Sequence, residues 1–184
     1  METFTELKAF VDNPRYHKQR LSYLGELDIR TIDAPIVDII SGFAKLPYCY
    51  TLQSCYGHFL HSSQKNLSNV EPLPISNSIT HVEYRIAYIA FCIENSNLGR
   101  AFFQDLREIP SIDPEYIQFG CAEWFWGKTV NSYALQVEPQ RHMYEDKVPT
   151  ISYEEALYIE KTRNKFFAQL EKLLRERLEK NQSS

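Results

Sequence analysis

The chain has 184 residues, of which 43% are hydrophobic and 24% charged, and its formal net charge is -4. A chain of this length can fold without disulfides or a structural metal, so we expect one globular domain over residues 1–184 with a polar tail at 181–184. The acidic balance excludes a protein that holds nucleic acid by bulk positive charge, because phosphate neutralisation needs clustered Lys and Arg.

The start of the sequence lacks the basic-then-apolar pattern of a secretory signal, and no apolar run approaches the ~18 residues of a membrane-spanning helix. The cysteines are widely spaced within apolar segments, as is typical of reduced thiols: Cys49, Cys55, Cys92 and Cys121. We therefore expect a cytoplasmic protein with no membrane partner.

In the first half of the chain, apolar spacing predicts a helix over 3–24, which Asn13-Pro14 either breaks or restarts. A second helix is expected from an N-cap at Asp33 to about Lys45. A short strand follows over 48–54, and then a long polar loop over about 60–80.

In the second half, residues 81–93 predict a central strand, because both of its faces become apolar towards its end. A helix capped by Ser96 ends at Pro110, and residues 116–126 and 132–138 predict a hairpin that turns at Gly127-Lys128. After a loop over 140–149, Ser152 and Glu155 form a near capping box for one helix to about Lys180. This order predicts an α+β fold: a mixed or antiparallel sheet with helices packed on it and a long C-terminal helix.

The chemistry is concentrated at Ser54-Cys55-Tyr56-Gly57-His58, where the first strand ends. Gly57 allows a sharp turn, so the corner can present side chains and backbone N–H groups to a cleft. A thiolate paired with an imidazolium is a nucleophile, which makes Cys55 and His58 the candidate catalytic residues, with Ser54 and Gly57 in the ligand-binding wall. The competing interpretation is a small buried cysteine followed by a surface histidine.

A metal site is a second interpretation of the same segment. Cys55-x-x-His58-x-x-His61, with His81 across the loop, offers zinc-type ligands. A closed structural site needs four ligands and only three lie together, so no metal is predicted, and the sequence leaves open whether Cys55, His58 and His61 hold one.

The opposite wall of the cleft is predicted from the end of the last strand. Glu138, Arg141 and His142 lie there, and Arg85 lies on the central strand. Arg141 can hold a carboxylate or phosphate by a bidentate fork, and His142 titrates near neutral pH. We expect these side chains to converge with Cys55 on one cleft, the alternative being ordinary surface charge.

The segment from Leu46 to His58, with Ser54, Cys55 and Gly57, resembles the Ser-Ser-Cys-Ser-Gly-Arg strand end of the tRNA wybutosine-synthesis methyltransferase family. Gln53, Tyr56 and His58 replace Ser, Ser and Arg of that pattern, and the element order over about 36–142 is similar. The resemblance implies S-adenosylmethionine as methyl donor, a nucleotide or RNA substrate and a role in tRNA processing, although the net charge does not favour tRNA.

Two function classes therefore remain. One is an S-adenosylmethionine-dependent methyltransferase-like enzyme acting on a nucleotide or RNA. The other is a non-catalytic ligand-binding or protein-interaction domain, in which the apolar stripe of the C-terminal helix pairs with a second subunit to form a homodimer.

Overall fold

The computed structural model describes residues 4–145 and 147–182. Over these residues the fold is α+β, as predicted, and the strands pair antiparallel in two sheets. The larger sheet has the order β1 (Phe4–Thr5), β6 (Ile117–Ala122), β7 (Ser132–Val137), β5 (Ala87–Ile93) and β2 (Cys49–Cys55). The smaller sheet has the order β3 (His58–Leu60), β4 (His81–Arg85) and β8 (Thr150–Ser152).

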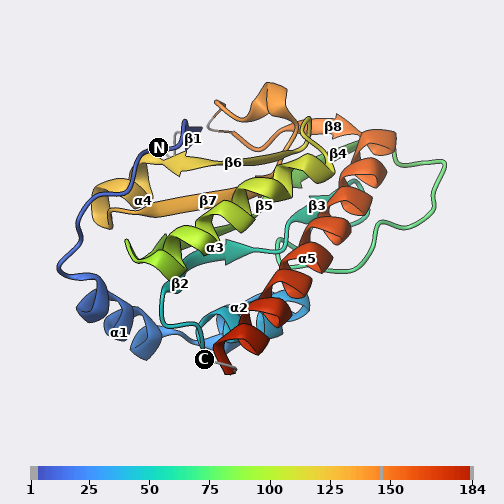
Figure 1. Cartoon of the computed structure of the whole chain (residues 1–184). Helices are drawn as coiled ribbons and strands as arrows, with labels where there is room; N and C mark the ends of the chain where they lie inside the picture. The colour runs from blue at the N-terminus through green and yellow to red at the C-terminus, as the bar shows by residue number, and fades with distance from the viewer. Residues whose placement is uncertain (1–3, 146, 183–184) are drawn as a thin grey trace.

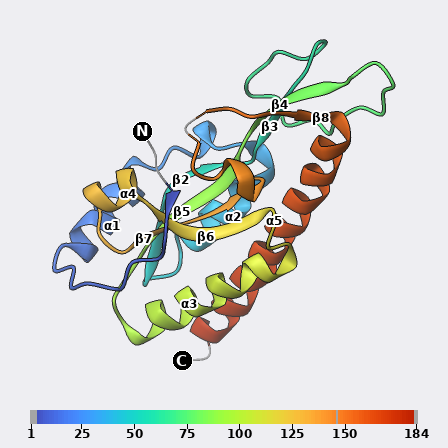
Figure 2. The same cartoon turned by 90° about the horizontal axis from the view of Figure 1, so that it is seen from above.

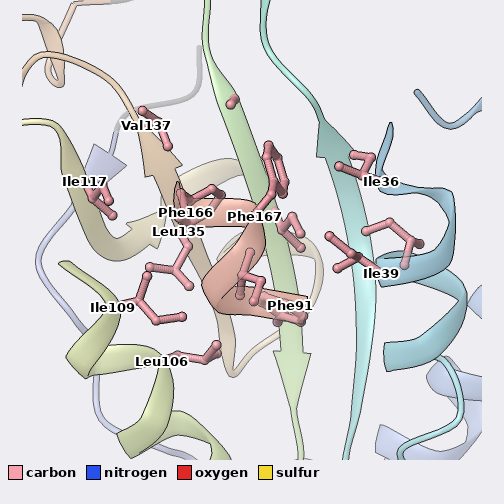
Figure 3. Packing of buried hydrophobic residues seen from close by; sticks show 14 of the residues in the cluster. Ile36, Ile39, Phe91, Leu106, Ile109, Ile117, Leu135, Val137, Phe166 and Phe167 are labelled. Atoms are coloured by element: carbon pink, nitrogen blue, oxygen red, sulfur yellow. The ribbon is translucent and has the colours of Figure 1, made fainter. Parts of the chain in front are cut away.

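Three helices cover one face of the larger sheet (Figure 1 and Figure 2): α2 (Val37–Phe43), α3 (Asn97–Glu108) and α5 (Tyr153–Gln182). The main hydrophobic core lies between these helices and the strands, and Figure 3 shows Phe91 and Leu135 of the sheet facing Leu106 and Phe166. The central strand predicted over 81–93 is confirmed for β5, which lies between β7 and β2, whereas residues 81–85 form β4 of the smaller sheet. On the other face, α1 (Tyr16–Glu26) packs Tyr16 against Tyr50.

The C-terminal helix α5 uses its apolar stripe inside this core. Its buried apolar residues are Ala156, Ile159, Phe166, Phe167, Leu170, Leu173 and Leu174. The Ser152 half of the capping box is confirmed, since Ser152 Oγ accepts a hydrogen bond from the Glu155 amide at 3.2 Å, while the Glu155 carboxylate accepts from Arg141 and Tyr116. The stripe that was to pair with a second subunit is thus covered by the chain's own sheet, and a homodimer would need another surface.

The two sheets are joined by one bent hairpin. Strand β2 runs into β3 and β4 runs into β5, while β2 pairs with β5 and β3 with β4. The bend falls at Tyr56-Gly57 on one arm and at Ile86 on the other. Gly57 has φ of 89°, and a Cβ there would lie 2.9 Å from the Ala87 Cβ, so both the conformation and the close approach require glycine.

The predicted helix over 3–24 is wrong in its first half. Phe4 and Thr5 form β1, which pairs with Ala122 and Cys121, and α1 begins only at Tyr16, just after Asn13-Pro14. Phe10 lies in a segment without regular secondary structure, and its ring packs 5.1 Å from the ring of Phe103. Long-range packing overrides the helical pattern here.

Other boundaries differ for similar reasons. Strand 116–126 ends at Ala122, because residues 123–128 form the short helix α4 (Glu123–Lys128) in place of the predicted turn. The loops predicted over 60–80 and 140–149 border two short strands, β3 and β8, that the sequence did not reveal. Asp33 makes no capping hydrogen bond. The predicted tail begins inside α5, which runs to Gln182, and residues 183–184 lie outside the described part.

No helix in the described ranges is both long enough and apolar enough to span a membrane.

Candidate functional site

A cavity of about 580 Å³ lies at the bend, on the face of the larger sheet opposite the main core. Small side chains, Ala122 and Ala134, leave room above the strands, and Gly120 lies opposite Ala134 in the register. Aromatic rings from several elements surround this space: Phe4, Tyr84, Tyr88 and Phe125. Leu67, Ser68, Met143, Val148 and Pro149 line it from two loops. A volume in this range suits a small organic ligand.

A β-bulge directs Cys55 into the cavity. The register between β2 and β5 shifts between Thr51 and Gln53, after which Cys55 lies opposite Tyr88. Because side chains alternate between the faces of a strand, one extra residue turns every later side chain to the other face. Cys55 therefore shares the cavity face with Tyr88, where an unbroken register would have turned it towards the main core.

Cys55 lies beside His58 and Asp33, and one ligand atom of each lies within 4.8 Å of the other two. His58 is buried, with Nε2 3.3 Å from Asp33 Oδ2 and Nδ1 3.0 Å from the Asn69 carbonyl oxygen. The Tyr56 amide donates to Asp33 Oδ2 at 2.7 Å. The sequence missed Asp33, since an acidic residue before a helical turn is ordinarily a cap.

These contacts determine the protonation states of His58 and Asp33. Asp33, and next Cys55, raise the pKa of His58 to about 10, against the opposing effect of burial. Burial raises the pKa of Asp33, but its contacts with His58 and the Tyr56 amide outweigh burial and leave that pKa lowered. At neutral pH the free protein therefore holds an imidazolium–carboxylate pair at this corner, and His58 is not free to act as a base.

Glu138 lies at the same edge of the sheet. Strands β2 and β7 run parallel on either side of β5, so their C-terminal ends emerge together. Glu138 is 5% exposed, and its Oε2 accepts a hydrogen bond from Gln136 Nε2 at 3.1 Å. Burial, and next repulsion by Glu145, raise the pKa of Glu138 to about 7. Glu138 is thus a carboxyl that exchanges its proton near neutral pH.

The cavity rim carries both signs of charge. Arg85 and Lys147 line it together with Glu145. Glu145 Oε2 lies 3.2 Å from Lys147 Nζ and 3.0 Å from His142 Nδ1. The rim can therefore meet a zwitterionic ligand.

The structure brings together part of the predicted cleft. Cys55, His58, Arg85 and Glu138 all line the cavity. Ser54 lies opposite Ile89 on the other face of the strand, and Gly57 forms the bend.

Two predicted ligand-binding residues lie outside the cavity lining. Arg141 is a surface residue whose Nη2 lies 2.7 and 2.6 Å from the two carboxylate oxygens of Glu155. His142 Nδ1 lies 3.0 Å from Oε2 of Glu145, which lines the cavity.

Arg163 of α5 supports the bend from the core side. Its side chain is 3% exposed, and Nη1 donates to the Gly57 carbonyl oxygen at 3.0 Å. The guanidinium also lies 4.0 Å from the ring centroid of Tyr56 and 5.1 Å from that of Phe59. A buried arginine on a corner backbone fixes the position of the flanking residues, Cys55 and His58 among them.

No protein-family model matches the chain, and no curated protein matches it. Among solved structures, the chain is similar to the PH1069 protein from Pyrococcus horikoshii, with 12% sequence identity and a TM-score of 0.45. The match covers 92% of this chain and 94% of that chain. A likeness at this level assigns neither a family nor a function.

Proposed function

We propose that the chain is an S-adenosylmethionine-dependent methyltransferase-like enzyme acting on a nucleobase of a nucleotide or RNA. The observation that carries the proposal is Glu138, a buried carboxyl with a pKa of about 7 that faces an aromatic-lined cavity of about 580 Å³. The identity of the methyl donor rests on the resemblance at Ser54, Cys55 and Gly57.

The lining fits S-adenosylmethionine by chemistry. Tyr88, Phe4 and Phe125 offer aromatic surface for the adenine. The carboxylate of Glu145 suits the sulfonium, and Arg85 and Lys147 suit the donor's carboxylate. When bound, the donor supplies an electrophilic methyl group.

A residue of the chain would accept the proton that methylation releases. Methylation of a ring N–H forms an N–C bond, breaks the S–CH₃ bond and releases one proton with S-adenosylhomocysteine. A base that titrates near neutral pH is best matched to accept that proton. Glu138 has this property, whereas His58 is already protonated and would act as a fixed positive charge beside Cys55. This assigns the base to a residue first predicted only to bind ligand.

The test is binding of S-adenosylmethionine and S-adenosylhomocysteine by isothermal titration calorimetry, followed by transfer of a labelled methyl group to tRNA from cells that lack the protein. Glu138→Gln should keep donor binding and lose transfer by ~100-fold or more, the usual scale for an acid–base residue. Ala134→Phe should fill the cavity and abolish binding. The matched control is Glu123→Gln, because Glu123 is exposed on α4 and pairs only with Lys8 among the described contacts. Absence of binding by both donor and product would refute the proposal, and binding without transfer would favour a ligand-binding domain.

A further inference from the structure

Asp33, Cys55 and His58 have the geometry of metal ligands. Among the described residues they are the group of three whose ligand atoms lie within 4.8 Å of one another. Asp33 precedes the turn that leads into α2, Cys55 ends β2, and His58 begins β3. The three positions belong to ordered backbone next to the bend that Gly57 and Arg163 hold.

The orientation of the imidazole distinguishes a metal site from a nucleophile triad. In a triad, Nδ1 faces the carboxylate and Nε2 faces the nucleophile. Here Nδ1 lies 3.0 Å from the backbone carbonyl oxygen of Asn69, and Nε2 is the ring nitrogen that faces Asp33. Nε2 is therefore also the ring nitrogen available to interact with Cys55. A metal-ligating histidine has this arrangement, with its second nitrogen donating to a carbonyl.

The spacing agrees with a shared cation. Nε2 of His58 and Oδ2 of Asp33 are 3.3 Å apart. A direct charge-assisted hydrogen bond between them would measure ~2.7–2.9 Å. Two ligand atoms held ~2.0–2.1 Å from a tetrahedral zinc ion lie about 3.3–3.4 Å apart.

Backbone amides support the other two ligands. The Gly57 amide lies 3.4 Å from Cys55 Sγ, and the Tyr56 amide lies 2.7 Å from Asp33 Oδ2. N–H groups aimed at a sulfur and a carboxylate stabilise the anionic forms that bind a cation.

We propose that Asp33, Cys55 and His58 bind a divalent cation of zinc type through Oδ2, Sγ and Nε2. Cys55 and His58 both line the cavity, so the fourth coordination position faces the ligand space, as in zinc sites that keep one position open. His61, the ligand that the sequence spacing suggested, lies outside this group and contacts Ser63 through Nδ1. Binding at Nε2 displaces the proton that His58 carries in the metal-free protein, so the ion would then supply the positive charge beside Cys55. The proposal needs no methyl donor.

The test uses the full chain, freed of metal with a chelator and titrated with Co²⁺ and Zn²⁺. The expected result is equimolar binding of Co²⁺ with a thiolate-to-metal charge-transfer band and the intense visible bands of a tetrahedral ion, both abolished by Zn²⁺. Asp33→Asn, Cys55→Ser and His58→Ala should each weaken Zn²⁺ binding by at least ~100-fold, more than outer-shell changes usually do.

Matched controls come from the same region. Asp38→Asn and His81→Ala change residues of the same types outside the group and should keep wild-type affinity. Circular dichroism establishes whether each variant folds. If a variant does not fold, the Co²⁺ absorption spectrum of the wild-type protein still tests the proposal. Three results would overturn the proposal: Co²⁺ binding without the thiolate band, failure to bind one equivalent of Zn²⁺, or wild-type Zn²⁺ affinity in Cys55→Ser. The cluster would then be a metal-free ion pair.

Discussion

Replacing Glu138 by Gln should change the pH dependence of stability in a defined direction. The carboxyl is 5% exposed, and burial raises its pKa from 4.5 to about 7. Between those values the folded state keeps a proton that the unfolded state releases. The stabilising contribution is therefore fully present below about pH 4.5 and is lost as pH rises through about 7.

The magnitude follows from the pKa difference. Each pKa unit corresponds to about 1.4 kcal/mol, so ionisation of Glu138 should lower the free energy of unfolding by about 3 kcal/mol between pH 4.5 and pH 8. The amide of the Glu138→Gln variant has no such ionisation, while its side-chain oxygen can still accept a hydrogen bond from Gln136 Nε2.

The assay is urea unfolding of wild type and Glu138→Gln from pH 5 to pH 8, followed by circular dichroism. The stability of the variant relative to wild type should rise across this range by an amount approaching 3 kcal/mol. His58, whose raised pKa gives stability that is lost between about pH 6.5 and pH 10, is common to both proteins and cancels. Equal pH slopes in wild type and variant would refute the buried-carboxyl reasoning, and Glu123→Gln should reproduce the wild-type slope because Glu123 is exposed.

Two further predictions concern the bend. Gly57→Ala should destabilise the fold by about 1–3 kcal/mol, because alanine must adopt φ of 89° against Ala87, whereas Gly25→Ala in α1 meets no atom within 4 Å and should be neutral or slightly stabilising. Arg163→Met should cost about 2–3 kcal/mol by leaving the Gly57 carbonyl without its charged donor, while Lys161→Met on the exposed side of α5 should have little effect. Urea unfolding measures both pairs, and equal losses within either pair would contradict the proposed roles of Gly57 and Arg163.

The sequence predicts what local patterns encode. Strong alternation and apolar runs located β5, α3 and α5, and the capping box placed the start of α5 to within a residue. Strand β1 could not be found in this way, because its two residues owe their conformation to pairing with β6. Short strands such as β3 and β8 likewise depend on partners distant in sequence, which periodicity does not report.

The candidate site shows the same division. Gly57 and the Cys55–His58 spacing marked the corner, and Glu138 was found because it follows a strand. Asp33 was assigned a local capping role, yet its carboxylate contacts His58, 25 positions along the printed sequence. Arg141 was expected to bind ligand, but Glu155 from another element satisfies its guanidinium. Pairing across the fold decides which charged groups remain for a ligand.

The concentration of irregular backbone at one corner favours a functional interpretation of Cys55 and His58 over a purely structural one. The register shift in β2 and the positive φ of Gly57 lie on either side of Cys55, and Ile86, where β4 and β5 separate, lines the cavity. The other described residue with positive φ, Asn131, has a structural explanation, because its side chain bonds both the amide and the carbonyl of Val11. Irregular backbone is often concentrated at sites of function. Here it places a thiol and an imidazole on the wall of the cavity that Glu138 also lines.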